Sequence, residues 1–163
     1  MSDFEHKSVM LGEVINALAI KPNGIYLDCT LGGGGHARAI AEQLDERGLL
    51  IGLDQDDDAI SAATERLTGL SCEIKIARAN FSELDKILDK FGISEFDGAL
   101  FDLGISSHQI DTAERGFSYM HDAPLDMRMD RRQNLTAREV INTYDEDCLI
   151  KIFRLPRIKW QTV

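Results

Sequence analysis

Short apolar runs alternate with amphipathic stretches along the first hundred residues of the chain. Four runs of a few residues each predict buried strands. They occupy residues 25–27, 49–53, 73–77 and 98–101. Around them, apolar residues recur every three or four positions, which predicts helices with one buried face. These helices are expected around residues 9–18, 37–44, 59–67 and 84–91. Strands that alternate with helices in this way form right-handed βαβ units, so the pattern predicts an α/β fold with a parallel sheet.

The pattern changes after residue 102. Residues 103–135 are expected to form a long, loop-rich stretch, and two short helices are expected at 136–143 and 146–153. Since no further strand is predicted, the sheet is expected to be incomplete, with an exposed edge that favours self-association. We therefore divide the chain into a core of residues 1–110 and a second region of residues 111–163.

Composition narrows the class of protein. Hydrophobic residues make up 44% of the chain, enough for a sizeable core. The three cysteines are widely spaced and form no CxxC pair, so neither a disulfide framework nor a metal site is predicted. No apolar run approaches membrane-spanning length, and the polar first residues do not resemble a secretory signal. These features favour a cytoplasmic protein with no membrane partner.

The net charge of −10 argues against a nucleic-acid partner, but the charge is unevenly distributed. Residues 1–110 hold 9 Lys/Arg and 19 Asp/Glu, whereas residues 111–163 hold 9 of each. The second region also contains the cluster Arg128, Arg131 and Arg132. This cluster fits either a solvated surface or a contact with nucleic acid.

A glycine-rich loop joins the first predicted strand to its helix. Residues 32–35 are all glycine, which lets backbone N–H groups and the helix N-terminus approach a ligand closely. Gly32, Gly34 and Ala37 also fit the G-x-G-x-x-A fingerprint of dinucleotide-binding proteins. A tight strand-to-helix turn is a third interpretation.

Acidic residues at two strand ends separate these possibilities. Asp54 lies about 20 residues beyond Gly34, where a carboxylate accepts the hydroxyls of a ribose. NAD and S-adenosylmethionine both contain that ribose. Asp28, just before the glycines, would repel a pyrophosphate but suits a sulfonium cation with an amino-acid tail, although a capping or turn role is the alternative. We therefore favour S-adenosylmethionine as the cofactor.

The end of the fourth strand is expected to carry the chemistry. Asp102, with the Leu103 carbonyl, can hold the N–H groups of an acceptor amine and orient its lone pair toward the donor methyl. This displacement needs no metal and no covalent intermediate. Methylation of a pyrimidine carbon usually needs a cysteine nucleophile, and none lies near Asp102 in sequence. Cys29 is expected to be a small core residue.

Two further residues fit both a site role and an ordinary structural one. Phe81 follows the third strand, where its ring can pack against an adenine or into the core. Gln109 can hydrogen-bond the cofactor or the base, or be a plain loop residue.

Five stretches together resemble the ribosomal-RNA small-subunit methyltransferase H (MraW) family, from about His6 to about Phe153. They are residues 6–13, 28–36, 53–56, 102–109 and 113–130. The last, AERGFSYMHDAPLDMRMD, is the most specific. The resemblance implies a Rossmann-like S-adenosylmethionine-dependent methyltransferase of the cytoplasm, which modifies the N4 amine of a cytosine in 16S ribosomal RNA of the small (30S) subunit.

The resemblance also implies individual roles. The cofactor contacts carried over from the family are Gly34, Gly35, His36, Asp54, Phe81, Asp102 and Gln109. Asp28 and Gly32 join this set from the residues themselves. A helical substrate-recognition region follows the fourth strand in the family, and residues 111–153 are similar to its beginning.

The sequence departs from the family from about residue 155, where LPRIKWQTV replaces the expected continuation. This departure predicts a C-terminally truncated member. The alternative to an active enzyme is then a catalytically inactive cofactor-binding fragment. An NAD-dependent dehydrogenase domain, supported only by the glycine fingerprint, is a further alternative.

Overall fold

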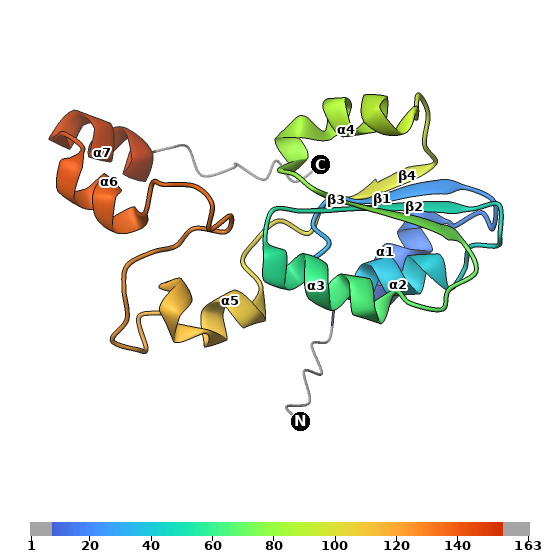
Figure 1. The fold of residues 1–163 in the computed structure, drawn as a ribbon, viewed down its shortest axis with the longest axis horizontal. Coiled ribbons are helices and arrows are strands. Elements are labelled where there is room, and N and C mark those ends of the chain that lie inside the picture. Colours follow the sequence, from blue (N-terminus) through green and yellow to red (C-terminus); the bar gives the residue numbers. More distant parts are fainter. Residues whose placement is uncertain (1–7, 155–163) are drawn as a thin grey trace. The chain divides into compact units, whose positions relative to one another are not determined.

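The computed structural model describes residues 8–154, which include a four-stranded, fully parallel sheet in the order β3-β2-β1-β4 (Figure 1). The strands are β1 (Ile25–Asp28), β2 (Leu49–Asp54), β3 (Glu73–Arg78) and β4 (Gly98–Leu100). The predicted α/β class with a parallel sheet is confirmed. Strand β4 ends at Leu100, one residue earlier than predicted, so Phe101 and Asp102 lie beyond the sheet.

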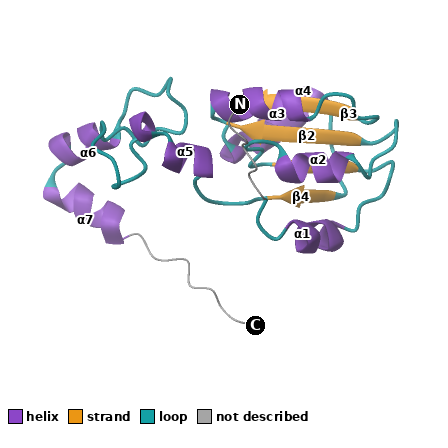
Figure 2. Ribbon diagram, turned by 90° about the horizontal axis from the view of Figure 1, so that it is seen from below, coloured by secondary structure: helices purple, strands orange, loops and turns teal. Residues whose placement is uncertain are grey.

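Helices cover both faces of this sheet (Figures 1 and 2). They are α1 (Leu11–Leu18), α2 (Gly35–Ala41), α3 (Asp57–Arg66), the 3-10 turn η1 (Phe81–Glu83) and α4 (Leu84–Phe91). In Figure 1, α1, α2 and α3 lie below the sheet and α4 lies above it. Right-handed crossovers explain this division. The chain steps one way from β1 to β2 to β3, and then returns past β1 to β4.

The core has two parts because successive strand residues point to opposite faces. Tyr26 and Leu50 belong to a cluster with α2 residues such as Ile40. Leu27 and Ile51 belong to the other cluster, against which α4 packs. Burial on both faces identifies β1 and β2 as the central strands.

The order of the strands reverses between β1 and β4, which pair directly through Tyr26↔Gly98 and Asp28↔Leu100. This reversal of strand order is the topological switch point of the sheet. Ligands of open α/β sheets bind at such a switch point. The glycine loop after β1 and Asp102 after β4 both start there.

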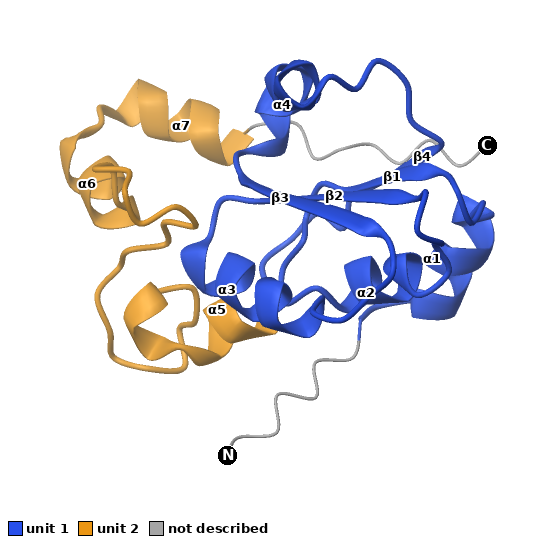
Figure 3. Ribbon diagram, turned by 45° about the vertical axis from the view of Figure 1, so that its right-hand side comes forward, with its two compact units in different colours: residues 1–106 blue, residues 107–163 orange. Residues whose placement is uncertain are grey.

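Residues from 107 onward form a second compact unit (Figure 3). Its elements are α5 (Ser107–Asp111), the 3-10 turn η2 (Ala113–Arg115), α6 (Ala137–Thr143) and α7 (Glu146–Arg154). The two predicted helices are confirmed as α6 and α7. The stretch 103–135 is rich in loops, as predicted, and it also holds α5 and η2, which are too short to show helical periodicity. The atypical tail from residue 155 lies outside the described residues.

Between residues 8 and 154, no helix has both the length and the apolar character needed to cross a bilayer. Among the described residues, β4 pairs with β1 on one side and forms an edge of the sheet on the other. The self-association expected through that edge stays a prediction.

Candidate functional site

The glycine loop packs closely against two other segments. Gly34 has φ 76°, and a Cβ added there would lie 3.1 Å from the Cα of Ala63 in α3. A side chain at Gly35 would collide with Ser8, which lies against the start of α2. The positive φ and the nearby backbone of Ala63 favour glycine at position 34, whereas a Cβ at position 35 would displace only the rotatable Oγ of Ser8.

Asp54 fixes the other side of this loop. Its Oδ2 accepts a hydrogen bond from the backbone N–H of Gly32 at 2.8 Å. Its Oδ1 accepts from the N–H groups of Gln55 and Asp56, at 2.8 and 3.0 Å. A carboxylate has about four acceptor positions, so Asp54 is held in place and retains capacity for a ligand hydroxyl.

Asp28 is a buried carboxyl group, only 1% exposed. Its Oδ1 accepts from the backbone N–H of Thr30 at 3.1 Å, whereas its Oδ2 has no hydrogen-bond partner. Burial raises the pKa of Asp28 to about 6; the Thr30 hydrogen bond and His36 oppose this rise, and the charges of Asp54 and Asp102 add to it. The switch point thus brings three carboxyl groups close enough to affect one another, an arrangement that a bound cation would stabilise.

Thr30 joins the two sides of the switch point. Its Oγ1 accepts a hydrogen bond from the backbone N–H of Asp102 at 2.8 Å, and the N–H of Cys29 donates to Leu100 O at 2.9 Å. These bonds continue the β1–β4 pairing past the end of the sheet. The Asp102 side chain is 51% exposed, so its carboxylate is available to a substrate.

His36 connects Asp102 with the segment before α1. Its Nε2 lies 2.9 Å from Val9 O, and its Nδ1 lies 3.9 Å from the Oδ2 of Asp102. The ring itself is buried. The position of His36 in the first turn of a helix gives no sign of these contacts in the sequence.

Phe81 is 41% exposed, which leaves much of its ring surface open to a ligand. Its ring meets that of Phe101 edge to face, with the centroids 5.9 Å apart and the planes at 87°. Such a T-shaped pair restrains both rings.

Cys29 is buried, and burial together with the neighbouring Asp28 raises the pKa of its thiol to about 12. A thiol with so high a pKa carries almost no thiolate at neutral pH, so it is a poor nucleophile. The expectation that Cys29 is a core residue agrees with its place in the second core cluster.

The first unit therefore gathers most of the site residues expected from the sequence. Contacts or mutual electrostatic effects connect Asp28, Gly32, His36, Asp54 and Asp102. Gln109 is buried in α5 and belongs to the second unit. Sequence analysis missed Thr30, Val9 and Phe101, because a link such as Thr30–Asp102 across 72 positions leaves no local pattern.

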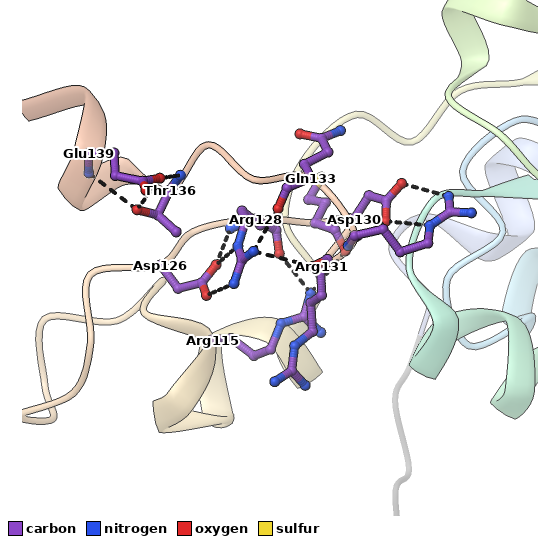
Figure 4. Close-up of polar contacts among 10 residues, drawn as sticks. Arg115, Asp126, Arg128, Asp130, Arg131, Gln133, Thr136 and Glu139 are labelled. Carbon is purple, nitrogen blue, oxygen red and sulfur yellow. Dashed lines mark hydrogen bonds and ion pairs between the residues drawn. The ribbon is translucent and has the colours of Figure 1, made fainter. Parts of the chain in front are cut away.

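The arginine cluster of the second unit is largely engaged in its own loop (Figure 4). Arg128 forms a two-pronged ion pair with Asp126, and Arg132 forms one with Asp130. The guanidinium of buried Arg115 donates to the carbonyls of Arg128 and Met129, at 3.0 and 3.2 Å. These contacts give the cluster a structural role in shaping residues 126–132.

Comparisons with known proteins place this sequence among relatives. A model described as the MraW methylase family matches residues 3–156. Ribosomal RNA small subunit methyltransferase H of Clostridioides difficile is 53% identical over 152 residues, covering 93% of this chain and 49% of the relative. The protein of the same name from Lachnospira eligens is 55% identical, with 93% and 48% covered. The chain thus spans about half the length of these relatives.

Among solved structures, a candidate rRNA-methylase from Clostridium thermocellum matches with a TM-score of 0.54 and 25% identity. The match covers 61% of this chain and 55% of that one. It supports a Rossmann-like arrangement for the described sheet.

Proposed function

The chain belongs to the MraW methylase family, and on that premise we propose that it binds S-adenosylmethionine for methyl transfer to the N4 amine of a cytosine in small-subunit ribosomal RNA. One observation carries the proposal. The buried Oδ2 of Asp28 has no hydrogen-bond partner, although it lies beside a glycine loop at the switch point of the sheet. An unpaired buried acceptor is costly, so a ligand with a positively charged donor fits there.

The residues around Asp28 fit the rest of this cofactor. The ammonium of its amino-acid part suits Asp28, and the ribose hydroxyls suit Asp54. The half-exposed ring of Phe81 suits the adenine. Bound in this way, the cofactor would supply a methyl group on a sulfonium, an electrophile with a good leaving group. The same three carboxyl groups weaken the case for a nicotinamide dinucleotide, because they would repel its negatively charged pyrophosphate.

Asp102 is the proposed catalytic residue. Its carboxylate is half-exposed, while Thr30 holds its backbone beside the end of β1. A carboxylate in this position accepts N–H groups of an amine and points the nitrogen lone pair at the methyl carbon. The high pKa of Cys29 argues against methylation of a ring carbon through a cysteine adduct.

The RNA part of the proposal rests on the names of the relatives, which are small-subunit rRNA methyltransferases. We expect the 30S subunit or its RNA to be the partner, in the cytoplasm. Residues 111–163, proposed as the beginning of the substrate-recognition region, hold equal numbers of acidic and basic residues.

Calorimetric titration of S-adenosylmethionine into the purified chain tests cofactor binding. We expect saturable binding that Asp54→Ala abolishes, since it removes the ribose acceptor and the Gly32 contact. Glu65→Gln, an exposed acid on α3, is the matched control and should bind like the wild type. A folded chain that shows no binding would contradict the proposal.

Transfer of tritiated methyl groups to 30S subunits tests the reaction. Digestion of the RNA should release N4-methylcytidine, and Asp102→Ala should reduce the yield at least a hundredfold. Cofactor binding without any transfer by the wild-type chain would favour the alternative, a cofactor-binding fragment that lacks catalysis.

A further inference from the structure

The tautomer of the neutral His36 ring is fixed by its neighbour at the start of the chain. The carbonyl of Val9 can only accept a hydrogen bond, and it lies 2.9 Å from Nε2. Nε2 therefore carries the proton, and in the neutral ring Nδ1 is left with a free lone pair.

That lone pair faces another acceptor. Nδ1 lies 3.9 Å from the Oδ2 of Asp102, too far for a direct hydrogen bond and close enough to share a donor. His36 and Asp102 both interact electrostatically with Asp28 at the end of β1, as does Asp54 at the end of β2. Two acceptors without a proton between them are best satisfied by a group with two N–H bonds. An amine nitrogen can lie about 2.9 Å from both atoms.

We propose that Nδ1 of His36 accepts one N–H of the substrate amine beside Asp102 and takes up the proton that the amine loses. This inference rests on the proposed methyl transfer. The nitrogen lone pair forms a bond to the methyl carbon while the carbon–sulfur bond breaks, and its electrons stay on sulfur. The methylated nitrogen then passes one proton to Nδ1, which gives a neutral secondary amine and an imidazolium, and the imidazolium releases the proton to solvent.

In this mechanism each of the contacts around His36 and Asp102 has a role in the reaction. The Val9 carbonyl orients the ring, Thr30 holds the backbone of Asp102, and Asp102 stabilises the imidazolium as it forms. His36 would thus act as a general base that its neighbours orient. A purely structural role for His36 would be fulfilled by the Nε2 contact with Val9 O and would not explain why Nδ1 faces Asp102.

Nitrogen-15 NMR of the histidine rings tests the inference on the full chain. His36→Gln assigns the His36 signals; it can place an amide nitrogen near Val9 O while leaving nothing at the Nδ1 position. The probes are cytidine 5′-monophosphate and, as the matched control, uridine 5′-monophosphate, which has a carbonyl in place of the amine. Both are added with S-adenosylhomocysteine present. His121, exposed in the second unit, is the internal reference.

We expect the proton of the neutral His36 ring to lie on Nε2, and an upfield shift of Nδ1 with the cytidine nucleotide that the uridine nucleotide does not produce. Asp102→Asn should reduce this shift by half or more. A proton on Nδ1 of the neutral ring, or an equal response to both nucleotides, would overturn the inference. The inference would also be overturned if the Nδ1 signal did not shift with either nucleotide in a chain that binds S-adenosylhomocysteine. Absence of S-adenosylhomocysteine binding would instead count against the proposed function, and the tautomer would still decide the role of His36.

Discussion

The carboxylate of Asp54 and the backbone of Gly32 are joined by a hydrogen bond of 2.8 Å between Oδ2 and N. This bond connects the end of β2 to the loop that follows β1. The glycine loop and the acid at the next strand end are the two features most suggestive of an adenosine ligand. This bond holds them together before any ligand binds. Such preorganisation lowers the entropy lost on binding.

Asp54→Asn should destabilise the protein even without a cofactor. An asparagine oxygen can still accept from Gln55 and Asp56, but its NH₂ group then faces the Gly32 N–H, so two donors meet. We expect the free energy of unfolding to fall by about 1–3 kcal/mol in urea titrations. Glu65→Gln makes the same chemical change on the surface and should stay within about 0.5 kcal/mol of the wild type. Equal stability of the two variants would show that the Gly32 bond contributes little.

Asp28 should make the protein less stable as the pH rises. Its pKa is raised from 3.8 to about 6 in the fold, so between these values the native state holds more protons than the unfolded state. The free energy of unfolding therefore falls through this window, by up to about 3 kcal/mol, and the loss persists at higher pH. Asp28→Asn should be more stable than the wild type at pH 7.5 and should lose this part of the pH dependence.

The same residue links stability to ligand binding. A cationic ligand favours ionised Asp28, so wild-type affinity for S-adenosylmethionine should increase as the pH rises through about 6 and then level off. Calorimetry at pH 5, 6, 7 and 8 measures this. An affinity that does not change with pH in the wild type, or the same dependence in Asp28→Asn, would refute the assignment.

Neighbouring glycines of the loop should respond very differently to alanine. Gly34 has φ 76°, and its Cβ would meet Ala63, whereas a Cβ on Gly33 would have nothing within 4 Å. Gly34→Ala should lower the free energy of unfolding by at least about 1–2 kcal/mol, and Gly33→Ala should have little effect. Thermal unfolding of the pair provides the measurement. A similar loss in both would mean that the loop relaxes to accommodate either side chain.

Arg115 should be needed for the order of residues 126–132. Arg115→Met keeps the length of the apolar stem but removes the hydrogen bonds to Arg128 O and Met129 O. Hydrogen exchange of amides in this loop should accelerate at least tenfold, as expected when about 1.4 kcal/mol of local stability is lost. Arg138→Gln, an exposed arginine on α6, is the control. Unchanged protection in Arg115→Met would mean that the ion pairs of Arg128 and Arg132 suffice.

Local sequence patterns predicted most of the elements and the chemical character of the site. The apolar runs of β1 and β2, the glycine loop, and the acids Asp28, Asp54 and Asp102 are all local signals. Helical periodicity and turn chemistry act over a few residues, so they can be recognised without a fold. The same reasoning gave no sign of α5, which is only five residues long and has no repeat to detect.

The tertiary structure decided how these residues meet. No pattern in the chain states that β4 lies beside β1 rather than beyond β3. That placement brings Asp102 to Thr30 and His36, and it buries Asp28 with one oxygen unpaired. Burial and long-range pairing depend on the summed packing of the whole sheet. The acids could therefore be expected from the sequence, whereas the raised pKa of Asp28 and the orientation of His36 required the fold.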